Sequence, residues 1–118
     1  MIKLPIKTSS ESEFNQAIEW FEIAFDSPPY KADSTYTFFN LGKYEIALYK
    51  EKEEFFERRQ KKIVYVVVND IVTIFNRLIS MGANVIQKPF PLGEEIMIAR
   101  VKNPFGHILC LVDGPPYK

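Results

Sequence analysis

The sequence contains very few of the residues that cross-link small proteins or bind metal ions. Cys110 is the only cysteine, so no disulfide can form within one copy of the chain, and His107 is the only histidine. A lone thiol suits a reducing compartment, so we expect a cytoplasmic protein. A metal site built from several histidines cannot come from a single copy of this chain.

Long apolar runs and an excess of one charge are also missing. No stretch approaches the roughly 18 apolar residues of a membrane-spanning helix. The residues from Met1 to Pro5 are not followed by the apolar core of a signal peptide. Fifteen basic residues balance fifteen acidic ones, which leaves no electrostatic signature for nucleic acid or an anionic surface. We therefore expect neither nucleic acid nor a membrane as a partner.

The sequence does contain enough apolar material for one core. Of its 118 residues, 47% are hydrophobic, with ten Phe and six Tyr, and a chain of this size needs no disulfide or metal to fold. We expect a single domain over 1–118, with a first module at about 1–50 and a second at about 62–113. The charged segment at about 51–61 is predicted to link them. Its Phe55-Phe56 pair indicates a lid or a partner contact.

The second module has the clearer secondary-structure pattern. The apolar run Ile63–Val68 predicts a strand covered on both faces. Asn69-Asp70 can cap a helix that ends at Gly82, and its apolar residues recur at helical spacing: Ile71, Ile74, Phe75, Leu78 and Ile79. Three further strands are predicted, at 83–87 (broken by Pro89 and Pro91), 96–102 and 108–112. The turn Asn103-Pro104-Phe105-Gly106 joins the last two.

The first module follows the same order of elements. Residues 2–7 alternate around Pro5, as in a short edge strand. Ser10 and Glu13 have capping-box spacing. The helix that begins there carries one apolar face and stops at residues 26–29; that face comprises Phe14, Ala17, Ile18, Phe21 and Phe25. Strands are predicted within 30–41 and at 44–49. The two halves therefore repeat one plan at a period of about 55 to 60 residues.

Three motifs in the second module occur in an order known from one superfamily. They are Val66-Val67-Val68-Asn69-Asp70, then Gly82-Ala83-Asn84-Val85, then Asn103-Pro104-Phe105-Gly106 followed by Cys110-Leu111. The chain thus resembles the vicinal oxygen chelate superfamily, which includes glyoxalase I, extradiol dioxygenases, and fosfomycin and bleomycin resistance proteins. The resemblance implies an α+β fold of two βαβββ modules whose mixed sheets curl into a cup. It also implies a homodimer.

The metal ligands of that superfamily have no counterparts here. Its metal-dependent members hold a divalent ion with His and Glu from four strands. Carried over one at a time, those positions fall between Leu4 and Ile6, at Ala47, between Lys62 and Val64, and at Cys110. These side chains do not supply the ligands that such ions need. The comparison therefore implies no metal and no cofactor.

This leads to a function with two alternatives. We expect a metal-independent protein that binds a small organic molecule in an apolar, aromatic cup, as bleomycin resistance proteins do without catalysis. One alternative is a metal-dependent glyoxalase-like lyase, isomerase or dioxygenase. The other is a non-catalytic dimeric interaction module. Whether the protein is an enzyme stays open, although the missing ligands favour a binding protein. The fold supports many functions, so the choice rests partly on analogy.

Nine residues are candidates for lining the ligand pocket. The aromatic ones can contact a ligand or simply pack, and Arg100 can hold an anion or form a surface ion pair. Glu45, Ala47 and Tyr49 share one strand face. The full set is Tyr36, Phe38, Glu45, Ala47, Tyr49, Val64, Tyr65, Arg100 and Cys110.

His107 and Cys110 are also candidates for chemistry. They are three residues apart on a strand and so face opposite sides, which argues against a nucleophile and base pair. For His107 we favour a structural position after the turn over a general base.

Overall fold

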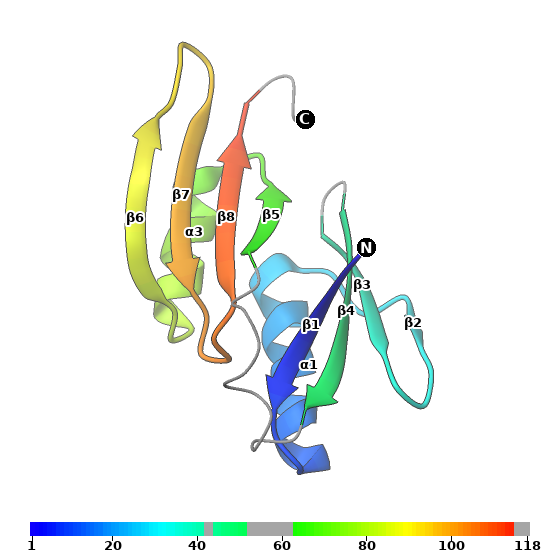
Figure 1. Ribbon diagram of the computed structural model, residues 1–118. Helices are drawn as coiled ribbons and strands as arrows, with labels where there is room; N and C mark the ends of the chain where they lie inside the picture. The colour runs from blue at the N-terminus through cyan, green and yellow to red at the C-terminus, as the bar shows by residue number, and fades with distance from the viewer. Residues whose placement is uncertain (42–43, 52–62, 115–118) are drawn as a thin grey trace.

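The computed structural model describes residues 1–41, 44–51 and 63–114. Its first half comprises β1 (Ile2–Lys7), α1 (Glu11–Phe25), β2 (Lys31–Ala32), β3 (Thr37–Leu41) and β4 (Tyr44–Glu51). Its second half comprises β5 (Ile63–Val67), α3 (Ile71–Ser80), β6 (Asn84–Pro91), β7 (Met97–Lys102) and β8 (Ile108–Asp113). Each half forms a four-stranded sheet, in the orders β1-β4-β3-β2 and β5-β8-β7-β6 (Figure 1).

Both sheets are mixed, and they are built alike. The first strand of each half pairs in parallel with the last, as β1 with β4 and β5 with β8. The remaining neighbours are antiparallel. These features confirm the predicted α+β class and the repeated βαβββ plan.

One hydrophobic core joins the two halves. Both helices lie on the same side of the two sheets (Figure 1), and a single buried cluster contains residues of α1, α3 and both sheets. Trp20 of α1 donates a hydrogen bond from Nε1 to the carbonyl oxygen of Met81, at 2.9 Å. Arg77 of α3 donates to the carbonyl oxygen of Ala24, at 3.3 Å. The predicted apolar face of the first helix omitted Trp20, which is buried.

The helix ends follow the sequence signals closely. Ser10 accepts a hydrogen bond from the Glu13 N–H, and Asp70 accepts one from the Thr73 N–H, so both predicted caps are present. The capping box is not reciprocal, however, because the Ser10 N–H donates to Oγ1 of Thr8 instead, at 2.9 Å. Gly82 has a φ of 94° after α3, which is the left-handed conformation that glycine adopts readily.

Two strand predictions need correction. Residues 63–68 were expected to be covered on both faces, but Ile63 is 46% and Tyr65 52% exposed. The reason is that β5 is an edge strand with one covered face. Pro89 and Pro91 do not break the preceding strand, because β6 runs to Pro91. A proline is tolerated there since β6 is also an edge, and its pairing with β7 shifts register twice.

Most of the predicted charged linker lies outside the described residues, including Phe55 and Phe56. Its first residue, Glu51, ends β4. Among the described helices, none is long and apolar enough to span a membrane.

Candidate functional site

Each sheet has one face against the helices and one face that points away from them, which we call the open face. In β4 the core residues Ile46 and Leu48 alternate with Ala47, and in β8 Leu109 and Leu111 alternate with Cys110. Side chains alternate along a strand, so Ala47 and Cys110 lie on the open faces. The open faces are the sides of the sheets that the helices do not cover, and Ala47 and Cys110 themselves are buried there.

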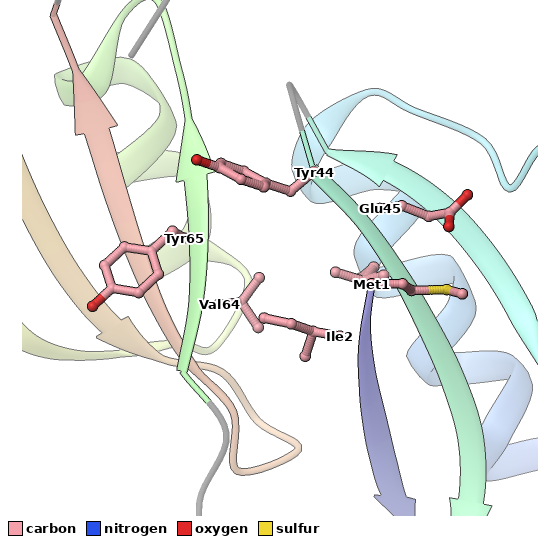
Figure 2. Close-up of a pocket in the computed structure, with 7 residues that line it drawn as sticks. Met1, Ile2, Tyr44, Glu45, Val64 and Tyr65 are labelled. Carbon is pink, nitrogen blue, oxygen red and sulfur yellow. The ribbon is translucent and has the colours of Figure 1, made fainter. Parts of the chain in front are cut away.

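A cavity of about 350 Å³ lies where the two halves meet, between β1 and β4 on one side and β5 on the other. Ile2 and Val64 extend toward one another across it, and the ring of Tyr44 reaches from β4 toward β5 (Figure 2). The lining is mostly apolar and comprises Met1, Ile2, Tyr44, Glu45, Ile46, Val64 and Tyr65.

Three of the nine predicted residues line this cavity, namely Glu45, Val64 and Tyr65. Val64 does so from the helix-facing side of its strand, because it is 1% exposed and belongs to the main core. Glu45 is half-buried, and its carboxylate points away from Val64 and Tyr65 (Figure 2). Tyr65 turns its ring away from Val64, over β8 (Figure 2).

The sequence reasoning missed four lining residues. They are Met1, Ile2, Tyr44 and Ile46. Tyr44 could have been found as a large aromatic at a strand end, a position where side chains are seldom covered, and it is 46% exposed. The others could not, since their place at the cavity depends on how two edge strands from different halves approach each other.

Four more predicted residues gather on the open face of the first sheet. The ring of Tyr36 lies 5.8 Å from that of Tyr49 and 5.9 Å from that of Phe38, centroid to centroid. The register places Ala47 opposite both Lys3 and Phe38. Ala47 is fully buried, which suits a small residue between larger ones. These aromatics therefore pack mainly on one another, and they do not line the cavity.

Lysines cover two of those rings. Nζ of Lys3 lies 4.9 Å from the Tyr36 ring centroid, and Nζ of Lys31 lies 5.2 Å from that of Phe38. Both distances suit cation–π attraction.

The remaining two candidates, Arg100 and Cys110, are paired on the open face of the second sheet. Cys110 belongs to a small apolar cluster with Ile98 and Val112, separate from the main core. Burial raises the pKa of the Cys110 thiol, and the hydrogen-bonded guanidinium of Arg100 opposes that effect. A raised pKa keeps the thiol protonated at neutral pH, which makes Cys110 a poor nucleophile.

His107 is part of the structural framework. It is 2% exposed, its Nε2 lies 2.8 Å from the Pro5 carbonyl oxygen, and its Nδ1 lies 3.0 Å from Nδ2 of Asn103. Burial lowers the pKa of His107 to about 4. These contacts agree with the structural role favoured from the sequence. That His107 reaches the first half of the chain could not be predicted from local sequence.

The positions that would hold a metal ion do not fit one. Among the described residues, the candidate positions fall at one of Leu4, Pro5 and Ile6, at Ala47, at Ile63 or Val64, and at Cys110. Within residues 1–41, 44–51 and 63–114, no three His, Cys, Asp or Glu side chains are grouped in a way that could hold a metal ion. These residues supply one thiol and otherwise hydrocarbon, which is not a donor set for Zn²⁺ or a harder ion.

No family model matches the sequence, and no curated protein matches it. Solved structures, in contrast, match over almost the whole chain. The fosfomycin resistance protein FosX from Mesorhizobium loti has a TM-score of 0.68 at 16% identity, over 98% of this chain and 90% of that one. A bleomycin resistance determinant encoded on the transposon Tn5 has a TM-score of 0.68 at 11% identity, over 98% of both chains.

A third match points the same way. A glyoxalase-related enzyme from Fulvimarina pelagi has a TM-score of 0.67 at 12% identity, over 98% of this chain and 88% of that one. Identities this low establish the fold alone. The chain therefore has the fold of the glyoxalase and bleomycin resistance proteins, that is, of the vicinal oxygen chelate superfamily.

Proposed function

We propose that this protein binds a small organic molecule, without a metal ion, in the cavity between its two halves. The observation that carries the proposal is the mostly apolar cavity of about 350 Å³ with Tyr44 and Tyr65 on its rim. Ligand sites usually have volumes of roughly 300 to 1,000 Å³ and are lined by apolar and aromatic side chains with few polar groups. This cavity lies near the lower end of that range, so it suits a small ligand or one end of a longer one.

Two further observations support a binding role. Tyr44 and Tyr65 are each about half exposed, and an amphipathic aromatic ring at a rim can contact both an apolar ligand and water. The fold neighbours include proteins named for resistance to bleomycin and to fosfomycin. Metal independence rests on the side chains at the four strand positions described above, since they lack a donor set.

We also propose a homodimer in the cytoplasm. Ile63 leaves apolar surface exposed on an edge strand, and such surface is commonly covered by a partner. The proposed location rests on the single cysteine. Sedimentation equilibrium of the purified chain tests the dimer, and a monomer at all concentrations would contradict it.

A thermal-shift screen of aromatic and cationic compounds tests the binding proposal. A true ligand raises the melting temperature by mass action, equivalent to about 2.7 kcal/mol at a hundredfold excess over Kd. The shift should disappear in Tyr44→Ser and Tyr65→Ser, which change exposed rim residues. It should persist in Val72→Ser, because Val72 is 50% exposed on α3, outside the cavity.

Two results would favour the other functions. Stoichiometric divalent metal in the purified protein, by elemental analysis, would support an enzyme and contradict the proposal. The absence of any hit, together with a stable dimer, would support an interaction module.

A further inference from the structure

The open face of the second sheet presents its side chains in rows across the four strands. Backbone pairing places Tyr65, Cys110, Arg100 and Gln87 in one row, from β5, β8, β7 and β6 respectively. The next row consists of Val67, Val112, Ile98 and Phe90. A row that bears a phenol, a thiol, a guanidinium and an amide therefore lies directly beside an apolar row.

Arg100 is the charged member of that row, and its surroundings are largely apolar. It is half-buried and lies beside Ile98 and Cys110, which are 5% and 2% exposed. In the described part of the chain, the thiol of Cys110 is its hydrogen-bond partner, and no carboxylate forms an ion pair with it. A thiol is a weak acceptor, whereas a guanidinium has five N–H donors. Among the described residues, no carboxylate therefore occupies the N–H donors of Arg100.

We propose that Arg100 binds the oxyanion of the ligand, a carboxylate or sulfonate, while the ligand's aromatic or apolar body lies against the exposed ring of Tyr65. The inference rests on the proposed function and specifies the class of ligand. A planar guanidinium can hold an oxyanion through two parallel hydrogen bonds. In apolar surroundings these bonds gain strength because water competes less for the charges.

The geometry also sets the length of such a ligand. Arg100 is on β7, and β8 lies between it and β5. Two strand spacings amount to roughly 10 Å, which an aromatic body of two fused rings with a substituent can span. The Tyr65 ring extends from β5 toward β8 (Figure 2), and β8 lies between β5 and the strand that carries Arg100. The acid at the cavity, Glu45, directs its carboxylate away from Tyr65 (Figure 2), so it does not oppose an anion along this path.

Two fluorescent probes that differ in one charged group test the inference. Both 1-anilinonaphthalene-8-sulfonate and N-phenyl-1-naphthylamine carry the same aromatic body, but only the first has a sulfonate. Each probe is titrated into the full chain, into Arg100→Gln and into Lys102→Gln. Lys102 lies two residues from Arg100 on the same strand and the same face, so its variant removes an equal charge nearby.

We expect Arg100→Gln to raise the Kd of the sulfonate probe tenfold or more and to change that of the neutral probe less than twofold. Lys102→Gln should change the Kd of either probe by less than about twofold. Added salt should weaken the binding of the sulfonate probe more than that of the neutral probe, because only the sulfonate forms an ion pair, which is partly screened at the half-buried Arg100.

The contrary outcomes separate the two proposals. If Arg100→Gln weakens the binding of both probes equally, or of neither probe, the assignment of Arg100 is overturned while a binding site stays in place. If neither probe binds the full chain, the proposed cavity function fails, and this inference fails with it. If Arg100→Gln weakens self-association and leaves the sulfonate Kd unchanged, Arg100 pairs with a second copy, which also overturns the assignment.

Discussion

Nε2 of His107 lies 2.8 Å from the carbonyl oxygen of Pro5, although the two residues are 102 positions apart in the chain. The contact joins the turn before β8 to β1, and so the second half of the protein to the first. Nδ1 of His107 lies 3.0 Å from Nδ2 of Asn103, an amide nitrogen that can only donate. The ring must therefore be neutral with its proton on Nε2, which donates to Pro5.

The first prediction concerns stability against pH. Burial lowers the pKa of His107 to about 4, below its ordinary value of 6.5, so the unfolded chain binds the proton more tightly than the folded one. The contribution of His107 to the free energy of unfolding should therefore fall as pH drops below 6.5 and level off below 4, with a total loss of about 3 kcal/mol. Urea denaturation of the wild type and of His107→Gln, from pH 7 to pH 4, measures it.

The variant supplies the control because it removes the only histidine. The pKa values of Asp33 and Asp70 are also lowered, by hydrogen bonds to each carboxylate. Both the wild type and the variant contain these two residues, so their effects on stability cancel in the comparison. Equal pH dependence of the two proteins would contradict a buried neutral His107.

The second prediction concerns Asn103. Its Oδ1 accepts hydrogen bonds from the N–H groups of Phe105 and His107, and a carboxylate could keep both. Asn103→Asp would also place a negative charge beside Nδ1, which favours the doubly protonated ring. We expect the pKa of His107 to rise by roughly 1 to 3. NMR titration of the ring protons measures it directly, because no other histidine contributes.

Asn69→Asp is the matched control, since Asn69 is exposed before α3, beyond the other end of β8 from His107. It adds the same charge and should leave the pKa of His107 nearly unchanged. A similar shift in both variants would show a general charge effect.

The third prediction concerns the hydrogen bond from Trp20 of α1 to Met81, the residue that follows α3. Trp20→Phe removes the hydrogen bond from Nε1 to the Met81 carbonyl oxygen and leaves space in the core. We expect a loss of about 2 to 3 kcal/mol in the free energy of unfolding, from an unpaired carbonyl and reduced packing. Circular dichroism during urea denaturation suits the measurement because the variant lacks tryptophan fluorescence. Tyr65→Phe, at an exposed ring, should change stability by less than about 0.5 kcal/mol.

The fourth prediction concerns two glycines. Gly114 has a φ of 142°, and a Cβ there would lie 2.1 Å from the carbonyl oxygen of Glu95. Gly93 has nothing within 4 Å of the same added atom. We expect Gly114→Ala to cost about 2 to 4 kcal/mol and Gly93→Ala less than about 0.5 kcal/mol. Thermal denaturation of both compares them, and equal costs would contradict the close approach at Gly114.

Local signals in the sequence predicted most of the fold. The caps at Ser10 and Asp70, the helical spacing after Ile71 and the turn at 103–106 each depend on residues a few positions apart. Such interactions form within one segment, so the sequence of that segment suffices to indicate them. Even the placement of Cys110 on the open face follows from counting along one strand.

The site depended on contacts that no single segment contains. The exposure of Tyr65 follows from β5 being a sheet edge, and the row from Tyr65 to Arg100 follows from the register of three strands. The link from His107 to Pro5 needs both halves in place. The sequence by itself therefore determined the order of helices and strands, because that order depends on local properties of the chain. Only the tertiary structure decided which side chains meet at the cavity and beside Arg100, because packing between distant strands sets those distances.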